Sequence, residues 1–212
     1  MRALELFSGT HSIGRALESL GWEVISLDCE AKYDPTICKN IMAWDYEAFA
    51  PPGHFDFIWA SPDCTEYSIA KSTGIRDLMK ADGLVLRTLE IMAYFRPQAY
   101  CIENPATGLL KGRGLLDDFP WKDVCYCSYG TPYKKHTRIW NNLSNHWAPR
   151  PLCRRNCASF LSNGGNHATS AQKGPSGNND KTIDNFTRDQ LYRIPEPLCQ
   201  EIAAAVSGAI GE

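Results

Sequence analysis

The chain has 212 residues, of which 43% are hydrophobic and 22% are charged, and its formal net charge is −2. These values are typical of an ordinary globular protein of one domain, or of one domain with a small appendage. No run of about eighteen apolar residues is present, which argues against a membrane span, and the bulk charge does not indicate a nucleic-acid binder. Any such surface has to come from the local basic clusters at 111–113, 134–138 and 150–155.

The N-terminal residues begin directly with a strand-like segment and show no signal peptide. The nine cysteines of such a chain are predicted to be reduced thiols or metal ligands rather than disulfides. Together these features predict a cytoplasmic location.

The first 28 residues follow the order strand, turn, helix, strand. Residues 2–7 are predicted as a strand, 8–12 as a turn of small residues, 13–20 as a helix and 22–27 as a second strand that ends on Asp28. A carboxylate about 20 residues beyond such a turn can accept hydrogen bonds from two ribose hydroxyls. Because the turn lacks the pattern G-x-G-x-x-G, a nucleoside ligand is favoured over a dinucleotide.

Two further predicted strands end in candidate catalytic residues. The apolar run 55–59 leads into the turn 60–68, which contains Cys64, and the strand 99–102 leads into Glu103. The carboxyl ends of strands in an open α/β sheet line one crevice, so both side chains are expected there. The alternatives are a buried cysteine that happens to lie in a turn and a carboxylate that only caps a turn or helix.

The remaining predicted elements complete the domain. They are a short helix that begins at Asp45, a helix at 77–94, strands at 124–128 and 137–140, and a final helix at 198–210. The two strands flank the turn Tyr129-Gly130-Thr131-Pro132, which predicts an antiparallel pair at the edge of the sheet. The final helix has one apolar stripe and must pack against the domain.

Residues 148–182 are rich in Pro, Gly, Asn, Ser and Arg and have little hydrophobic periodicity. Cys153 and Cys157, followed by His167, lie within the range of zinc-ligand spacing. A tetrahedral site needs a fourth ligand, for which the candidates are Cys125, Cys127 and His146. The alternative is a loop with incidental thiols, although a segment so poor in apolar residues would need a metal to be ordered.

In chain order, these motifs resemble those of the DNA cytosine-5 methyltransferases. The matching segments are Leu4 to Gly9 for the Phe-x-Gly turn, Asp28 for the ribose-binding acid, Ser61 to Ser68 for the Pro-Pro-Cys loop, Glu103-Asn104-Pro105 for Glu-Asn-Val, Tyr129-Gly130-Thr131-Pro132 for Tyr-Gly-Val-Pro, and Ile194-Pro195 for the last motif. The resemblance covers residues 1–147 and about 186–210.

The resemblance implies an α/β fold, with a Rossmann-like methyltransferase sheet, flanking helices and a small irregular C-terminal insert. Residues 1–147 would form the catalytic domain that binds S-adenosylmethionine (SAM). Residues 148–182 would be a reduced target-recognition insert, the same segment for which the spacing of Cys153, Cys157 and His167 indicates a possible zinc staple, and 183–212 would carry a helix that packs back on the catalytic domain.

The resemblance also implies a reaction. The Cys64 thiolate would add to C6 of cytosine, Glu103 would hydrogen-bond or protonate N3, and Lys135 would replace an arginine of the family. The residues implied for SAM are Phe7, Ser8, Gly9, Thr10, His11, Asp28 and Pro62, with Asn40 or Asp45 at the adenine.

Two departures from the family bear on function. Asp63 replaces a proline before the cysteine, where an inward carboxylate would disfavour the thiolate. Only about 35 residues stand where relatives carry a target-recognition domain. A compact chain of this kind is typical of phage relatives, which implies the cytoplasm of a bacterial or phage-infected cell.

The expected partners are DNA, either single-stranded or duplex with a short motif, and a second protein that supplies target recognition; no membrane is expected. The alternatives are the same chemistry on a free cytosine nucleotide or with a modified SAM, or a catalytically weak regulator that binds SAM or DNA.

Overall fold

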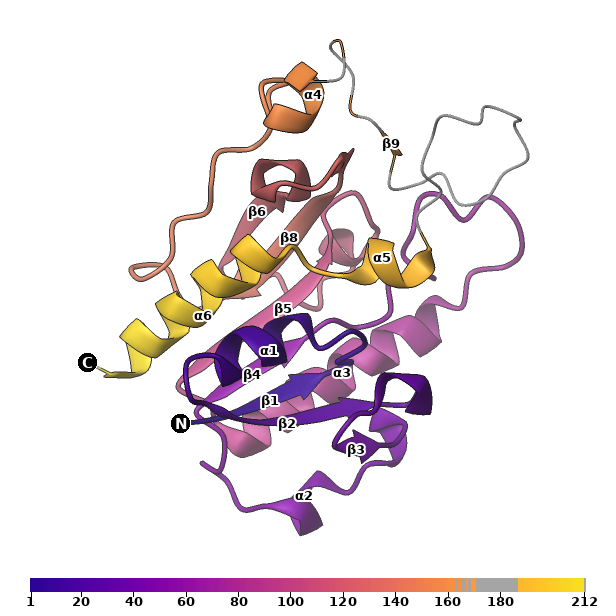
Figure 1. Ribbon diagram of the computed structural model, residues 1–212. Coiled ribbons are helices and arrows are strands. Elements are labelled where there is room, and N and C mark those ends of the chain that lie inside the picture. Colours follow the sequence, from indigo (N-terminus) through magenta and orange to yellow (C-terminus); the bar gives the residue numbers. More distant parts are fainter. Residues whose placement is uncertain (163, 165–166, 168, 171–186, 212) are drawn as a thin grey trace.

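The computed structural model describes residues 1–162, 164, 167, 169–170 and 187–211, and in them one seven-stranded sheet forms the centre of an α/β domain (Figure 1). The strand order is β3-β2-β1-β4-β5-β8-β6. The strands are β1 (Arg2–Leu6), β2 (Glu23–Asp28), β3 (Ile37–Cys38), β4 (Phe57–Ala60), β5 (Ala99–Pro105), β6 (Trp121–Cys125) and β8 (His136–Asn141). Strands β1 to β5 run parallel, and β8 is antiparallel to β5 and β6.

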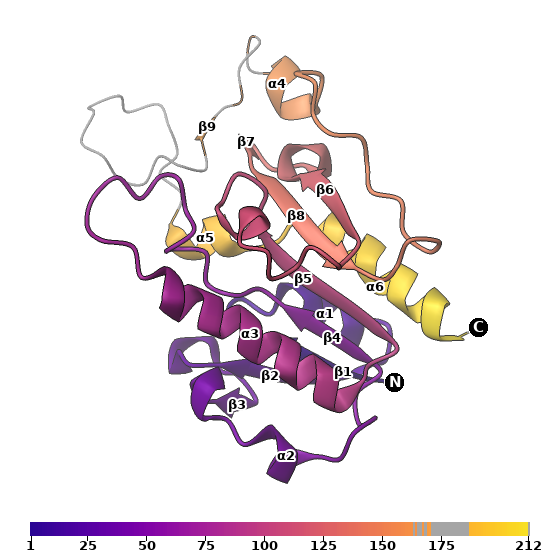
Figure 2. The same ribbon diagram turned by 180° about the vertical axis from the view of Figure 1, so that it is seen from behind.

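Helices cover both faces of this sheet. Helices α1 (Ser12–Glu18) and α6 (Glu196–Gly211) lie on one face, and α3 (Leu78–Phe95) lies on the other (Figures 1 and 2). Along β1, Ala3 joins the cluster under α1 and α6, whereas Leu4 and Leu6 join the cluster under α3. Burial on both faces explains why the parallel strands are almost continuously apolar.

The short elements connect the sheet and helices. They are η1 (Ala31–Tyr33), η2 (Ile41–Ala43), α2 (Tyr46–Phe49), η3 (Leu110–Gly112), η4 (Tyr126–Tyr129), β7 (Tyr133–Lys134), α4 (Ala158–Ser162), β9 (Thr169–Ser170) and α5 (Arg188–Tyr192). Strands β7 and β9 form a separate parallel pair. Of the 148–182 insert, residues 163, 165–166, 168 and 171–182 lie outside the described residues.

The antiparallel pair predicted at the edge of the sheet is confirmed as β6 and β8. The predicted bounds 124–128 of its first strand are wrong, because β6 spans Trp121–Cys125 and the next residues form the 3₁₀ helix η4. The backbone N–H of Tyr126 donates to the Lys135 carbonyl, and Gly130, with a φ of 93°, ends the helix. The sequence of β6 does not show a plain alternation of apolar and polar residues. It contains the charged Asp123, which the structure pairs with Arg138 of β8 at 2.8 Å.

No helix in the described part of the chain is long and apolar enough to cross a membrane.

Candidate active site

The turn after β4 is fixed from both sides. The Ser61 backbone N–H donates to the Leu6 carbonyl of β1 at 3.3 Å, and the Asn104 Nδ2 donates to the Pro62 carbonyl at 2.9 Å. Asn104 is fully buried in β5, next to Glu103. The two motifs are therefore held against each other, and Cys64 follows at the crevice beyond the carboxyl ends of β4 and β5.

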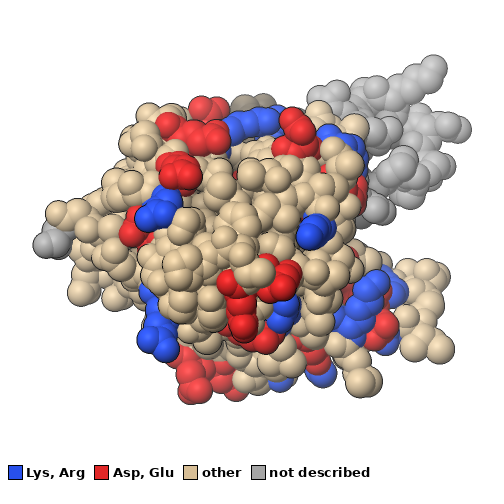
Figure 3. Space-filling view, turned by 90° about the horizontal axis from the view of Figure 1, so that it is seen from below, with Lys and Arg blue, Asp and Glu red and all other residues tan. Residues whose placement is uncertain are grey.

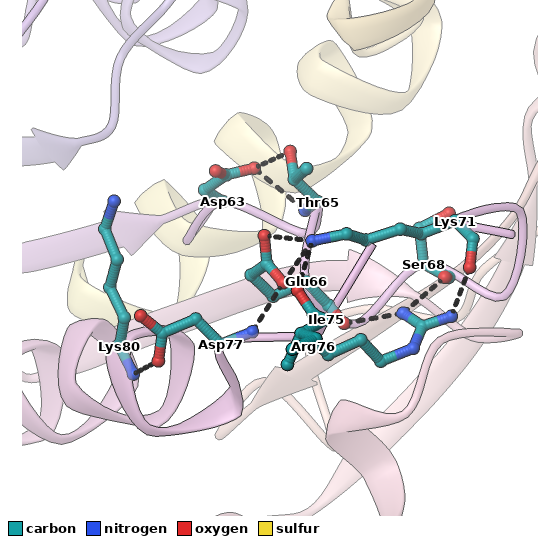
Figure 4. Close-up of polar contacts among 9 residues, drawn as sticks. All are labelled: Asp63, Thr65, Glu66, Ser68, Lys71, Ile75, Arg76, Asp77 and Lys80. Atoms are coloured by element: carbon teal, nitrogen blue, oxygen red, sulfur yellow. Dashed lines mark hydrogen bonds and ion pairs between the residues drawn. The ribbon is translucent and has the colours of Figure 1, made fainter. Parts of the chain in front are cut away.

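The side chain of Asp63 is engaged in a local turn. Its Oδ1 accepts hydrogen bonds from the Thr65 backbone N–H at 2.9 Å and from the Thr65 hydroxyl at 2.6 Å (Figure 4). Asp63 is exposed to solvent, where its charge is screened. The structure therefore gives this residue a role in shaping the turn rather than an inward position beside the thiol.

Three candidate catalytic side chains act on one another electrostatically. Burial raises the pKa of the Cys64 thiol to about 11, and the positive charge of Lys135 opposes this rise. The negative charge of Glu103 raises the pKa of the thiol further, and that of Asp63 does so less. Lys135 is therefore the group that favours the thiolate form of Cys64.

Tyr126 contacts two of the candidate catalytic side chains. Its hydroxyl donates to Glu103 Oε1 at 3.4 Å, and Lys135 Nζ lies 4.7 Å from the centre of its ring. Tyr126 is fully buried, and Glu103 is 8% exposed. The sequence did not single out Tyr126, since it lies in a run that looks like a plain apolar strand.

We expect Lys135→Met to slow alkylation of Cys64 several-fold near pH 8, because loss of the cation raises the pKa of the thiol and lowers the thiolate fraction. Lys135→Arg keeps the charge and should stay close to wild type. The measurement is the rate of iodoacetamide labelling of Cys64, followed by peptide mass spectrometry from about pH 7 to about pH 10. The exposed Cys38 serves as an internal control. Identical pH profiles for Lys135→Met and wild type would contradict the electrostatic role.

The loop that follows Cys64 is tied together by its own side chains (Figure 4). Arg76 donates to the backbone carbonyls of Glu66, Ser68 and Lys71, at 2.7, 2.7 and 2.9 Å. Lys71 pairs with Glu66 at 2.6 Å. At the start of the loop, Tyr67 is fully buried and its carbonyl accepts the Leu109 backbone N–H at 3.0 Å, which anchors this end in the domain.

The turn between β1 and α1 brings the residues implied for SAM together. Phe7, Gly9 and His11 have left-handed φ values of 57°, 45° and 53°. The Gly9 backbone N–H donates to Asp28 Oδ2 at 2.9 Å, and His11 Nε2 lies 2.6 Å from the Tyr33 carbonyl. Asp28 therefore lies beside the turn, at the carboxyl end of β2.

Two buried oxygens near this turn, Ser8 Oγ and Glu5 Oε2, make no hydrogen bond with the described residues. Glu5 Oε2 lies 3.8 Å from Nδ1 of His11. Burial raises the pKa of the Glu5 carboxyl to about 8. A Cβ on Gly14 would lie 2.6 Å from Glu5 Oε2, so a larger residue there would displace this buried carboxyl. SAM carries ribose hydroxyls and an ammonium group, and the Asp28 carboxylate and Ser8 Oγ beside this turn are acceptors that fit such donors.

The two candidates for the adenine contact lie in different places. Asn40 follows β3 and caps η2, where its Oδ1 accepts the Met42 backbone N–H at 2.9 Å. Asp45 caps α2, whose Phe49 stacks on Phe55 at the amino-terminal end of β4. Only Asn40 directly follows the carboxyl end of a strand, on the side of the crevice.

Helix α5 and the residues after it contact both the region of the β1–α1 turn and the candidate catalytic residues. Within the helix, Asp189 accepts the Tyr33 hydroxyl at 2.6 Å, and the Leu191 carbonyl accepts Lys135 Nζ at 3.2 Å. Just beyond α5, the Ile194 backbone N–H donates to Ser12 Oγ at 3.2 Å. The segment that resembles the last motif of the family therefore reaches both halves of the site.

The predicted metal ligands also meet. Cys153, Cys157 and His167 lie together with Cys127 of η4. Of the other candidates for the fourth ligand, Cys125 and His146 are not part of this group.

Comparison with known proteins supports the fold and the resemblance. The chain is 29% identical over 220 residues to "Probable DNA (cytosine-5)-methyltransferase" of Frog virus 3 (isolate Goorha), covering 95% of this chain and 98% of that one. No protein-family model matches the chain.

Two solved structures have a similar fold. A DNA modification methyltransferase encoded within an E. coli prophage matches with a TM-score of 0.52 and 14% identity, over 66% of this chain and 46% of that one. The Entamoeba histolytica methyltransferase EhMeth matches with a TM-score of 0.50 and 17% identity, over 72% and 56%. This chain therefore spans about half the length of these structures. The methyltransferase fold is confirmed, and so is the resemblance that the short motifs indicate.

Proposed function

We infer that the chain belongs to the DNA (cytosine-5)-methyltransferases, and we propose that it transfers a methyl group from SAM to C5 of cytosine in DNA. Two observations support this proposal: the charges of Lys135 and Glu103 act on the Cys64 thiol, and Tyr126 contacts both Glu103 and Lys135 near the carboxyl ends of β4 and β5. The turn with Gly9 and Asp28 opens beside them on the neighbouring strands.

C5 of cytosine is too weak a nucleophile to take a methyl group unaided. Addition of the Cys64 thiolate to C6 forms an S–C bond and turns the C5–C6 unit into an enamine, so that C5 can attack. Bound SAM would supply the electrophilic methyl group and would leave as S-adenosylhomocysteine. Water or a basic group would then take the C5 proton, which breaks the S–C bond and releases the Cys64 thiolate.

Glu103 supports the addition step. Negative charge develops on the ring as the thiolate adds, and a proton shared between Glu103 and N3 would neutralise it while the other carboxyl oxygen accepts the N4 amino group. Tyr126 holds this carboxyl by its hydrogen bond to Oε1. Recognition of the amino group would select cytosine over thymine.

The proposed cofactor contacts come from the turn and strand ends described above. Asp28 would accept the ribose hydroxyls, Asn40 would contact the adenine, and Pro62 would line the pocket between the two ligands. The backbone of residues 7–11 would surround the methionine part of SAM.

DNA must present the cytosine outside the stack, because C6 is inaccessible within a duplex. The insert after residue 147 is short, so a partner protein is proposed to supply target recognition.

A free cytosine nucleotide is the second candidate substrate. The near-neutral net charge of −2 favours it, because binding to the phosphates of DNA depends on clustered Lys and Arg. On the one face that Figure 3 shows, Lys and Arg are interspersed with Asp and Glu.

The test is incubation with methyl-labelled SAM and either cytosine-containing DNA or dCMP, with Cys64→Ala in parallel. Label in DNA that is lost in the variant supports the proposal, whereas label only in dCMP assigns the nucleotide as substrate. SAM binding without label in either would identify a regulator that binds SAM, and would overturn the catalytic assignment.

A further inference from the structure

Four side chains from three separate segments converge beside the edge of the sheet. Cys127 comes from η4, Cys153 and Cys157 from the start of the insert, and His167 from beyond α4. Their ligand atoms all lie within 4.8 Å of one another. His167 Nε2 is 3.5 Å from the sulfur of Cys153 and 3.3 Å from that of Cys157.

These distances suit one tetrahedral metal ion. Zinc bonds of about 2.3 Å to sulfur and about 2.0 Å to nitrogen place the ligand atoms of a tetrahedron about 3.5 to 3.8 Å apart. All nine cysteines are free thiols, so no disulfide accounts for the cluster. Three thiolates with one imidazole form a ligand set that selects zinc over the hard cations magnesium and calcium.

The surrounding segment has little else to hold it. Helix α4 has no buried residue, and Leu152 and Leu161 are 40% and 67% exposed. Arg155 takes a left-handed φ of 66°, which turns the chain between Cys153 and Cys157. A segment that cannot bury apolar surface requires another source of stability, and a structural metal ion is a common one.

We propose that Cys127, Cys153, Cys157 and His167 bind one structural zinc ion, which fastens the insert to η4. Two nearby hydrogen bonds also join the insert to the segment around η4. Ser128 donates to the Pro151 carbonyl at 3.0 Å, and Ser159 donates to the Pro132 carbonyl at 2.9 Å. The ion would thereby fix the insert beside the turn after Tyr129, whatever reaction the crevice performs.

The neighbouring Cys125 allows a sharp test of the ligand set. Its sulfur lies 3.1 Å from that of Cys127, yet it is outside the group of four. We expect about one equivalent of zinc in protein purified without chelator, a loss of most of it in Cys127→Ser, and retention in Cys125→Ala and in the surface control Cys38→Ser. Cys157→His should retain the metal where Cys157→Ser loses it, because imidazole replaces thiolate as a ligand.

Three results would overturn the proposal. These are less than about half an equivalent of zinc in the wild type, wild-type content in Cys127→Ser, and loss of zinc in Cys125→Ala with retention in Cys127→Ser. Cobalt substitution gives an independent readout that does not depend on catalysis. The visible bands of a tetrahedral thiolate-bound Co²⁺ should appear in wild type and Cys38→Ser, and their absence from wild type would count against the site.

Proteolysis tests the fastening itself. Arg154 and Arg155 are exposed between two of the ligands. Chelation should accelerate tryptic cleavage there by about tenfold, with cleavage at the exposed Lys111 unchanged. Equal rates at Arg154 and Arg155 with and without chelator would show that zinc does not hold this segment.

Discussion

Cys64→Ala is expected to abolish methyl transfer, with a loss of at least about 10⁴-fold, while SAM binding stays unchanged. Without the sulfur, no covalent addition to C6 can occur and C5 remains unreactive. The most direct measurement is a trap with DNA that contains 5-fluorocytosine. Fluorine replaces the proton that must leave C5, so the wild-type protein should stay covalently bound to the DNA on a denaturing gel.

The matched control for this substitution is Cys38→Ala, which removes an exposed thiol at the edge of the sheet. Both activity and the covalent complex should persist in it. A Cys64→Ala protein that still methylates DNA at more than about a hundredth of the wild-type rate would rule out the covalent route.

Glu103→Gln is expected to lower methyl transfer by about 10² to 10⁴-fold, and at the same time to make Cys64 more reactive toward iodoacetamide. The two effects have opposite signs because the carboxyl does two things. It stabilises charge on the cytosine ring during addition, and its own negative charge raises the pKa of the Cys64 thiol. Removal of that charge lowers the pKa, so the thiolate fraction at a given pH increases.

These two rates are measured on the same preparation, by label transfer and by peptide mass spectrometry. Glu23→Gln, at an exposed position of β2, is the control that removes one carboxylate elsewhere. A parallel fall of both rates in Glu103→Gln would indicate a damaged fold. Unchanged methyl transfer would remove Glu103 from the proposed mechanism.

The sequence predicts the strand-end residues well because topology places them. Asp28 ends β2 and Cys64 follows β4 in one parallel sheet, and parallel strands bring their carboxyl ends to the same edge. Such a prediction needs only the order of elements, which hydrophobic patterns and short turns reveal. The hydrophobic pattern also predicts the helix at 77–94, which the structure has at Leu78–Phe95.

The contacts that complete the site could not be predicted in this way. Tyr126 reaches Glu103 across 23 positions of sequence, and Leu191 reaches Lys135 across 56. No local sequence pattern predicts either contact, because both depend on how β8 enters the sheet between β5 and β6. The fourth metal ligand was open for the same reason. Cys125 and Cys127 are two positions apart, and the turn into η4 decides which sulfur meets the others.

The loop beyond Cys64 has a consequence for the entropy of substrate binding. Every hydrogen bond that the Lys71 and Arg76 side chains make within the described residues ends between Glu66 and Ile75, so the loop keeps its shape without a substrate. Ordering a free backbone costs about 1 to 2 kcal/mol per residue, and a flexible loop would lose that amount each time it closed on a substrate. Here the guanidinium of Arg76 has already ordered the chain, and closure would leave only the two ends of the loop to adjust.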